Sequence, residues 1–255
     1  MLLVIDIGNT NTSLGIFEED KLIHTFALSS DIKKTDDEYG ISLLTILNHN
    51  NLTSKVKGAI VSSVVPQLCE IYKSAIKKYL NIEAITLSYK SILPIKLNLK
   101  NNKEIGADRI ANAAAATIKY SLPAIVIDFG TATTFDIVDE NANFIGGIIA
   151  PGLKIQAKSL SQFTSKLPKL KIEAPNEAIG SDTISAMLSG IVLGHGAMIE
   201  GMIRRCEKEL GKKATVIATG GYSDVLFNDL DNTINYIDKN LTLFGLKELY
   251  YLNKE

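Results

Sequence analysis

The chain begins with an apolar run, Leu2-Leu3-Val4-Ile5, followed directly by Asp6-Ile7-Gly8-Asn9-Thr10-Asn11-Thr12. About half the chain later the same order returns, with Ile125-Val126-Ile127 ahead of Asp128-Phe129-Gly130-Thr131-Ala132-Thr133-Thr134. Each copy is a strand of the buried type, then an aspartate, a glycine and a run of small hydroxyl and amide residues. A second apolar stretch follows each copy, which predicts a β-hairpin in each half of the chain.

The residue types in these two turns suit the binding of a phosphorylated ligand. Glycine lets the backbone approach a bulky anion, and threonine, asparagine and backbone N–H groups donate hydrogen bonds to phosphate oxygens. The aspartate that ends each strand repels phosphate, but it can hold a hydrated Mg²⁺ that bridges to phosphate. Two such loops would hold a nucleotide polyphosphate from both sides. The alternative is that both are ordinary hairpin turns, which the repeated order of residues disfavours.

The composition is that of a globular soluble protein. Of the 255 residues, 46% are hydrophobic and 22% are charged, and the formal net charge is -1. We therefore expect no nucleic-acid partner and no binding to a membrane surface. We identify no apolar run of membrane-spanning length and no leader ahead of the first strand. Cys69 and Cys206 read as free thiols of a cytoplasmic protein, and His24, His49 and His195 as structural or surface residues without metal-ligand spacing.

The order of predicted elements repeats in the two halves as three strands, helix, strand, helix, strand, helix. In the first half we predict strands at Leu2–Ile7, Ser13–Glu18, Lys21–Leu28, Val56–Ser62 and Glu83–Leu87, and helices at Asp36–Leu47, Pro66–Leu80 and Ile105–Tyr120. In the second half we predict strands at Ala124–Phe129, Thr133–Val138, Asn143–Ile149, Thr215–Thr219 and Ile234–Ile237, and helices at Gly152–Phe163, Asp182–Leu210, Ser223–Leu230 and Leu243–Leu252. We expect domains over residues 1–117 and 118–255, without a low-complexity linker.

This duplicated meander with a glycine-bearing turn in each half resembles the actin-like, sugar kinase and heat-shock ATPase superfamily. The resemblance covers essentially the whole chain. It implies an α/β fold in which two ribonuclease-H-like domains flank a nucleotide cleft, and each domain contributes one phosphate loop.

A third motif, Gly106-Ala107-Asp108-Arg109, opens the alanine-rich helix. Arg109 could bind a substrate carboxylate, because a guanidinium matches its geometry. Asp108 could accept a proton from an attacking hydroxyl, as a general base does in phosphoryl transfer. The alternative is that Asp108 serves the helix start and pairs with Arg109 on the surface.

Three further motifs have both a functional and a purely structural interpretation. Gly146-Gly147 with Pro151-Gly152 allows close backbone approach or simply a tight strand-to-helix turn. Ser181-Asp182-Thr183 can cap a helix and present Thr183 to a ligand, and the glycines that follow at 190, 194 and 196 suggest a close helix–helix contact, which could lie between subunits. Thr219-Gly220-Gly221 ends a strand and could let a flat ring lie on the backbone.

Together these motifs resemble the type III pantothenate kinases, enzymes that phosphorylate pantothenate with ATP in the first step of coenzyme A synthesis. The resemblance implies that Asp6, Ile7, Gly8, Asn9, Thr10, Asn11, Thr12, Ser13 and Thr131 contact ATP. It implies that Gly106, Ala107, Asp108, Arg109 and Thr183 hold pantothenate, with Asp108 as the proton acceptor. It also implies Mg²⁺ held through water by Asp6, a monovalent cation (K⁺ or NH₄⁺) at Asp128, and a homodimer whose interface helps to build the pantothenate pocket.

The chain departs from the family pattern at two positions. Leu99 stands where relatives often carry a tyrosine that contacts the substrate, and Asn102 stands where many have proline. The contact near residue 99 therefore does not carry over, and the wall of the pocket there is expected to be more apolar.

Two other functions fit the same superfamily. One is a kinase for another small acceptor, such as a sugar or acetate. The other is a nucleotide-switched binding or regulatory protein, which would need additional partner-binding segments. No insertion longer than a dozen or so irregular residues is evident, which disfavours the second possibility.

Overall fold

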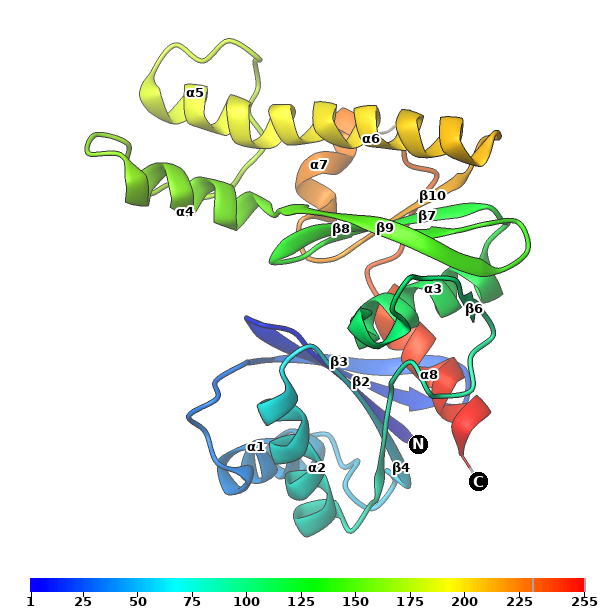
Figure 1. Ribbon diagram of the computed structural model, residues 1–255. Helices are drawn as coiled ribbons and strands as arrows, with labels where there is room; N and C mark the ends of the chain where they lie inside the picture. Colours follow the sequence, from blue (N-terminus) through cyan, green and yellow to red (C-terminus); the bar gives the residue numbers. More distant parts are fainter. Residues whose placement is uncertain (231, 255) are drawn as a thin grey trace. The chain divides into compact units, whose positions relative to one another are not determined.

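The computed structural model describes residues 1–230 and 232–254. They form two compact units, Met1–Ile118 with Leu241–Glu255, and Lys119–Asn240. Each unit has a mixed sheet with helices packed on it (Figure 1). The predicted α/β class is therefore confirmed. The last helix differs from the predicted division, because it packs with the first unit and not with residues 118–240.

The sheet of the first unit has the strand order β3-β2-β1-β4-β5. Strands β1 and β2 pair antiparallel, as do β2 and β3, whereas β4 and β5 run parallel to β1. The strands are β1 (Leu2–Ile7), β2 (Asn11–Glu18), β3 (Lys21–Ser29), β4 (Gly58–Ser63) and β5 (Ala84–Thr86). The helices are α1 (Asp36–His49), α2 (Pro66–Leu80), α3 (Ala107–Lys119) and α8 (Leu241–Asn253). A short strand, β6 (Lys96–Leu97), and a 3₁₀ turn, η1 (Asn102–Glu104), interrupt the section before α3.

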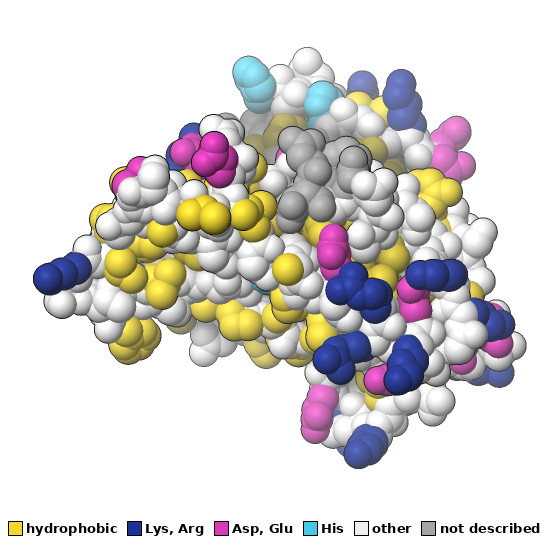
Figure 2. Space-filling model, turned by 90° about the horizontal axis from the view of Figure 1, so that it is seen from above, with side chains coloured by type: hydrophobic (Ala, Val, Ile, Leu, Met, Phe, Trp, Pro, Cys, Tyr) yellow, Lys and Arg dark blue, Asp and Glu magenta, His cyan; other side chains and the backbone are white. Residues whose placement is uncertain are grey.

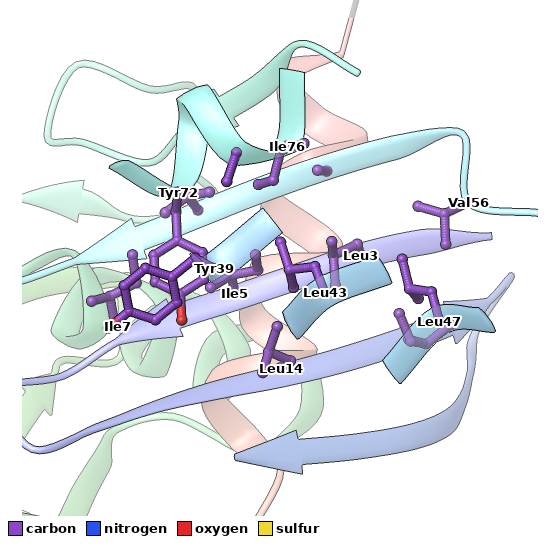
Figure 3. Close-up of a cluster of buried hydrophobic side chains, with 14 of the residues drawn as sticks. Leu3, Ile5, Ile7, Leu14, Tyr39, Leu43, Leu47, Val56, Tyr72 and Ile76 are labelled. Atoms are coloured by element: carbon purple, nitrogen blue, oxygen red, sulfur yellow. The ribbon is translucent and has the colours of Figure 1, made fainter. Parts of the chain in front are cut away.

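Strand β1 is buried on both faces because helices cover each side of its sheet. On one face Leu3, Ile5 and Ile7 pack against side chains of α1 and α2, among them Tyr39 and Tyr72 (Figure 3). Burying each of these side chains is worth about 1.5–3 kcal/mol relative to an exposed position. The uninterrupted apolar run at the start of the chain is thus the signature of a strand with no solvent-facing side.

The other face of this sheet is covered by α3 and α8. Leu2 and Val4 form one cluster with Ile110 of α3 and with Leu243, Leu246 and Leu249 of α8. The two helices also approach each other closely. A Cβ built on Gly245 would lie 2.1 Å from the carbonyl oxygen of Ala111, and Thr242 Oγ1 donates to Asn112 Oδ1 at 2.7 Å. This cluster is why α8 belongs to the first unit.

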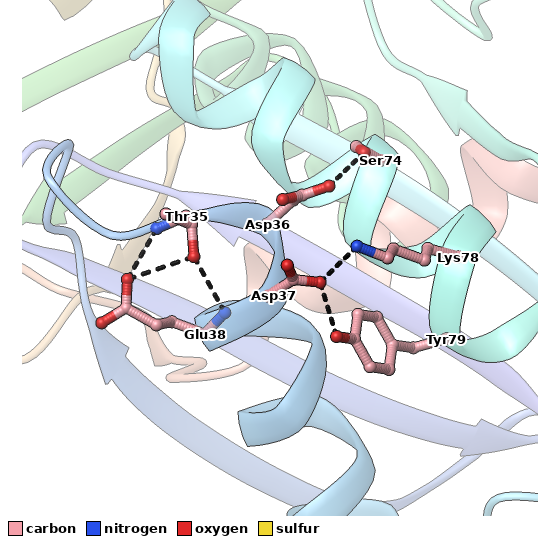
Figure 4. Close-up of polar contacts among 7 residues, drawn as sticks. All are labelled: Thr35, Asp36, Asp37, Glu38, Ser74, Lys78 and Tyr79. Atoms are coloured by element: carbon pink, nitrogen blue, oxygen red, sulfur yellow. Dashed lines mark hydrogen bonds and ion pairs between the residues drawn. The ribbon is translucent and has the colours of Figure 1, made fainter.

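Helices α1 and α2 are joined by polar contacts at their exposed ends (Figure 4). Thr35 caps α1, since its hydroxyl accepts from the N–H of Glu38 and the Glu38 carboxylate accepts from the N–H of Thr35. Asp37 on α1 accepts from Lys78 and from Tyr79 Oη of α2, and Lys78 and Tyr79 lower the pKa of its carboxyl. The predicted helix start at Asp36 is confirmed.

The second unit repeats the meander of the first. Its strands have the order β11-β10-β7-β8-β9, with β7, β8 and β9 antiparallel and with β10 and β11 parallel to β7. The strands are β7 (Ala124–Phe129), β8 (Ala132–Val138), β9 (Asn143–Pro151), β10 (Thr215–Thr219) and β11 (Tyr236–Ile237). The helices are α4 (Leu153–Phe163), α5 (Thr183–Leu188), the π-helical turn η2 (Ser189–Leu193), α6 (Gly194–Leu210) and α7 (Ser223–Leu230).

Elements α5, η2 and α6 form one continuous helix over Thr183–Leu210, so the predicted helix here is confirmed. It ends at Gly211, which has the left-handed φ of +71°. By length and hydropathy alone this helix could cross a membrane, with 44% of its most apolar window buried in the protein. Ile191, Ile199 and Ile203 pack into the core of the second unit, which is the pattern of a core helix. The sequence analysis predicted this helix but did not recognise it as long and apolar enough to pass that test.

Candidate active site

The first of the two predicted phosphate loops joins β1 to β2. Asp6 pairs with Ser13 and Ile7 with Thr12, so Asp6 stands at the end of the strand beside the turn. Inside the turn the N–H of Gly8 donates to the carbonyl of Asn11 at 3.0 Å. A Cβ at Gly8 would lie only 3.1 Å from that carbonyl oxygen. Residues 9–11 are exposed, so their backbone and polar side chains can reach a phosphate.

The start of α3 lies at the same edge of the first sheet as this loop. The N–H of Val64, just after β4, donates to the carbonyl of Ile7 at 3.1 Å. A Cβ built on Gly106 would lie 3.4 Å from Val64 Cγ1 and 2.4 Å from Asp108 Oδ1. Glycine at 106 therefore leaves the room that the Asp108 carboxylate occupies. The structure brings together two predicted sets of site residues, 6–13 and 106–109.

Asp108 is half-buried at the first turn of α3. Its Oδ1 accepts a hydrogen bond from the N–H of Arg109 at 2.8 Å. Burial raises the pKa of the Asp108 carboxyl, although the hydrogen bond and the charge of Arg109 oppose that change. A carboxylate with a raised pKa is a better proton acceptor than an exposed one. The predicted helix-start position of Asp108 and its suitability as a base are therefore not alternatives, since the residue has both properties.

The segment before α3 contains Leu99 and Asn102, the two residues at which the chain departs from the family pattern. Leu99 is half-buried, and its N–H donates to Asn102 Oδ1 at 3.3 Å. The Asn102 amide donates to the carbonyl of Leu97 at 3.2 Å. Asn102 thus fastens the turn ahead of Gly106 through its side chain.

The second predicted phosphate loop joins β7 to β8 in the second unit. Asp128 pairs with Thr134 and Phe129 with Thr133. The N–H of Gly130 donates to the carbonyl of Ala132 at 3.1 Å, and Thr131 is exposed at the tip. The turn is one residue shorter than the first, because three residues separate Phe129 from Thr133 whereas four separate Ile7 from Thr12. Otherwise the two hairpins have the same plan.

Gly220 shapes the surroundings of Asp128. It follows β10, whose last residue, Thr219, is paired with Asp128. Gly220 has a φ of +89°, and a Cβ there would lie 2.5 Å from Asp128 Oδ1 and 2.6 Å from the backbone N of Phe129. Of the Gly-Gly turn singled out in the sequence, Gly220 is therefore the residue that leaves room for Asp128, whereas a Cβ at Gly221 would meet nothing within 4 Å.

Thr183 is the remaining predicted site residue. It is exposed at the start of α5 in the second unit. The preceding Asp182 caps the helix, since its carboxylate accepts from the N–H of Ser185 at 2.9 Å. Asp182 therefore has the capping role that the sequence predicted, and the exposed Thr183 hydroxyl is available to a ligand.

One residue of the second unit was not selected from the sequence. His195 is buried, and its ring bonds Thr133 of the second hairpin and Gln156 of α4. No local pattern predicts these contacts, because Thr133 and Gln156 are both distant from His195 along the chain. The sequence signal was weak, a single polar residue inside a largely apolar stretch of helix.

Comparisons with known proteins determine which kinase this arrangement belongs to. Residues 2–205 match the sequence profile of the type III pantothenate kinases. The type III pantothenate kinase of Finegoldia magna is 45% identical over 258 aligned positions, which cover 100% of this chain and 98% of that protein. The Exiguobacterium enzyme of the same name is 41% identical, with 100% of both chains covered.

The chain belongs to the type III pantothenate kinase family. Members are phosphotransferases that use ATP to phosphorylate pantothenate in coenzyme A biosynthesis, and this function is therefore that of the chain. The reaction depends on ATP and a divalent metal ion. The family is one of soluble biosynthetic enzymes.

Solved structures give the fold. The activator of 2-hydroxyisocaproyl-CoA dehydratase from Clostridium difficile, solved with bound ADPNP, superimposes with a TM-score of 0.52 at 14% identity. The alignment covers 98% of this chain and 93% of that chain. This is the two-domain actin-like ATPase fold that the repeated hairpins predicted.

Proposed function

We propose that the two hairpin loops and the start of α3 divide the work of the pantothenate kinase reaction. Residues 6–13 and Thr131 hold the phosphates of ATP, and Gly106–Arg109 with Thr183 hold pantothenate. Asp108 accepts the proton of the attacking hydroxyl. The observation that carries the proposal is the position of Asp108, half-buried at the same sheet edge as the first loop and with a raised carboxyl pKa.

In the chemical step, the hydroxyl oxygen of pantothenate forms a bond to the γ-phosphorus of ATP. The bond between that phosphorus and the β,γ-bridging oxygen breaks, and ADP leaves with the electron pair. The hydroxyl proton passes to the Asp108 carboxylate. Because phosphoryl transfer has a loose, charge-rich transition state, most of the rate enhancement comes from positioning and from hydrogen bonds to the phosphate oxygens.

The donor set fits Mg²⁺ bound mainly by water and phosphate. Within residues 1–230 and 232–254, no three His, Cys, Asp or Glu side chains gather into a metal site. A single carboxylate beside a phosphate loop is how proteins commonly hold Mg²⁺ with a nucleotide. We assign this role to Asp6, through water. When bound, the ion would neutralise phosphate charge.

A monovalent cation, K⁺ or NH₄⁺, fits beside Asp128. Gly220 keeps the space next to Asp128 Oδ1 that a Cβ would fill. Oxygen ligands such as a carboxylate can replace part of the hydration shell of a cation like K⁺.

Arg109 is our candidate for binding the pantothenate carboxylate. It follows Asp108 on the first turn of α3 and is half-buried. We expect Arg109→Ala to raise the KM for pantothenate on the order of 10- to 100-fold, the range for loss of a hydrogen bond to a charged group. The KM for ATP should change less than about threefold in the same steady-state assay. Arg109→Lys tests the fork geometry, because lysine keeps the charge and loses the bidentate contact. Equal effects on both KM values would contradict the assignment.

A homodimer is supported by an apolar surface on α4, α5 and the loop between them. Phe163 is 81% exposed, Ile179 86% and Ile184 51%. On the same continuous helix as Ile184, a Cβ at Gly190 or Gly194 would meet nothing within 4 Å. Gly190 and Gly194 are thus not packed against other described residues, whereas Gly196 is buried. Figure 2 shows apolar side chains gathered toward the left of the face that it presents, whereas most of its lysine and arginine side chains lie toward the right. Exposed apolar patches of this kind mark interaction sites.

We expect light scattering to give twice the mass of the chain. Phe163→Glu with Ile179→Glu should produce a monomer, because burying two charges in the interface is unfavourable. Ile92→Glu changes an isoleucine that is 63% exposed in the first unit and is the matched control. If light scattering gives the mass of a single chain for the unmodified protein at working concentration, the proposed dimer is wrong.

The decisive assay is detection of phosphopantothenate with ATP, Mg²⁺ and K⁺ present. The same assay with a panel of other hydroxylated acceptors tests specificity. We expect that pantothenate is phosphorylated and that the other acceptors are not. ATP turnover unaffected by any acceptor would indicate a nucleotide-switched protein. We place the enzyme in the cytoplasm, where Cys69 and Cys206, both free thiols, stay reduced.

A further inference from the structure

His195 lies beneath the second phosphate loop and connects it to α4. The residue is 2% exposed, and its Nε2 lies 2.9 Å from Thr133 Oγ1. Its Nδ1 lies 2.8 Å from Gln156 Nε2. Thr133 is itself 1% exposed and is the first paired residue after the turn, opposite Phe129. The hydrogen bonds therefore run from α4 through the imidazole ring to the base of the loop.

Gln156 determines which nitrogen of the ring carries the proton. Its Nε2 also lies 2.9 Å from the carbonyl oxygen of Pro151, which can only accept a hydrogen bond. The amide nitrogen is therefore correctly placed, and it can only donate. Nδ1 of His195 must accept, so the neutral ring carries its proton on Nε2 and donates it to Thr133 Oγ1. Burial lowers the pKa of His195, which favours the same neutral ring.

The loop also contacts the residue that precedes α4. Gly152 precedes α4, and a Cβ there would lie 2.4 Å from the carbonyl oxygen of Thr131 and 2.7 Å from that of Gly130. Gln156 is four residues further along the same segment. The backbone of Gly130 and Thr131 thus contacts the entry to α4, and the adjoining Thr133 is hydrogen-bonded to His195.

The first unit repeats this anchor with a different partner. Thr12 pairs with Ile7 at the position that corresponds to Thr133 and Phe129. Thr12 is fully buried, and its Oγ1 lies 3.0 Å from Ser30 Oγ. Both loops therefore end on a buried threonine whose hydroxyl is hydrogen-bonded to a side chain from outside the hairpin turn. The repetition indicates that the anchored hydroxyl serves the loop.

We propose that His195 is a positioning residue for ATP, which acts by donating its Nε2 proton to Thr133 Oγ1 and so fixing the backbone of Gly130–Ala132. The inference rests on the proposed contact between Thr131 and the ATP phosphates. His195 touches no reacting atom. Its effect is on how well the second loop is preformed when the nucleotide binds.

The test compares variants that remove or retain this hydrogen bond. We expect His195→Phe to raise the KM for ATP about 5- to 10-fold, as for loss of one buried hydrogen bond, and to leave the KM for pantothenate within about twofold. His195→Gln, which can donate from its amide, should recover most of the difference. Thr133→Val should match His195→Phe, and the double variant should be no worse than either single variant, because both remove the same bond.

A spectroscopic measurement tests the inference even if the His195 and Thr133 variants do not fold. His24→Asn with His49→Asn leaves His195 as the only imidazole, since the chain has 3 histidines. Nitrogen-15 NMR at pH 7 should then report a protonated Nε2 and an unprotonated Nδ1. The opposite tautomer, or an imidazolium, would overturn the inference. So would a folded His195→Phe protein whose KM for ATP is within about twofold of the unmodified value.

Thr131→Ala separates this inference from the proposed function. An unchanged KM for ATP in that variant would remove the contact on which both depend. A raised KM in Thr131→Ala together with an unchanged KM in His195→Phe would leave the ATP site in place and overturn the role of His195 alone.

Discussion

Replacing Asp108 by asparagine is expected to lower kcat at least about 100-fold, the usual scale for loss of a general base. Asparagine keeps the size of the side chain and an oxygen that can accept from the N–H of Arg109, as Asp108 Oδ1 does at 2.8 Å. It cannot take the proton of the pantothenate hydroxyl. The Kd for ATP, measured by calorimetry, should stay within about twofold, because the first phosphate loop is unchanged.

The same variant should be at least as stable as the unmodified protein. The folded pKa of Asp108 lies above its ordinary value of 3.8. The stabilising contribution of the neutral carboxyl is therefore fully present below pH 3.8 and is lost as pH rises through the folded pKa. At neutral pH the buried carboxylate costs folding free energy, which asparagine removes. A thermal melt of Asp108→Asn should show an equal or higher Tm.

The pH dependence of kcat/KM provides the control for this assignment. Activity should fall tenfold per pH unit on the acid side, below a midpoint higher than the ordinary carboxyl value of 3.8, because protonation of Asp108 removes the base. The residual activity of Asp108→Asn should lack that limb. Normal turnover in Asp108→Asn would show that another group takes the proton.

Replacing Gly220 by alanine should destabilise the second unit by roughly 2–5 kcal/mol. Alanine at a φ of +89° is strained, which costs roughly 1–2 kcal/mol. Its Cβ would also lie 2.5 Å from Asp128 Oδ1 and 2.6 Å from the backbone N of Phe129. Displacing such neighbours costs about 1–3 kcal/mol more. Urea unfolding followed by circular dichroism measures the change.

The activity of Gly220→Ala should fall as well as its stability, because the added Cβ displaces the Asp128 carboxylate. We expect kcat/KM of Gly220→Ala to fall at least about tenfold, with a higher K⁺ concentration needed for half-maximal rate. Gly221→Ala is the matched control for stability, since a Cβ at Gly221 would meet nothing within 4 Å. A Gly220→Ala protein as stable as Gly221→Ala would contradict the account of this turn.

Features that depend on residues close together in the chain could be predicted from the sequence. The β1–β2 and β7–β8 hairpins follow from an apolar run, a turn of glycine and small polar residues, and a second apolar run. The helix boundaries follow from local signals as well: Thr35 caps α1, Pro66 opens α2 and Gly211 ends α6. The hydrogen bonds that define these features join residues close together in the chain, so propensity and capping determine them.

Features that depend on distant residues could not be predicted. His195 and Thr133 are 62 residues apart, and His195 and Gln156 are 39 apart. The predicted helix near residues 243–252 had an evident apolar face, but nothing local states which sheet that face covers. Leu243, Leu246 and Leu249 pack on the first sheet, with Leu2 and Val4.

By itself the sequence determined the two hairpins, the Asp108 motif and the family, because each is a pattern of adjacent residues with a direct chemical meaning. Only the tertiary structure decided that Asp108 lies half-buried at the edge of the first loop, that Gly220 makes room for Asp128, and that an imidazole supports the second loop. The physical reason is that burial and side-chain hydrogen bonding are properties of the packed chain, which brings together residues that no local pattern relates.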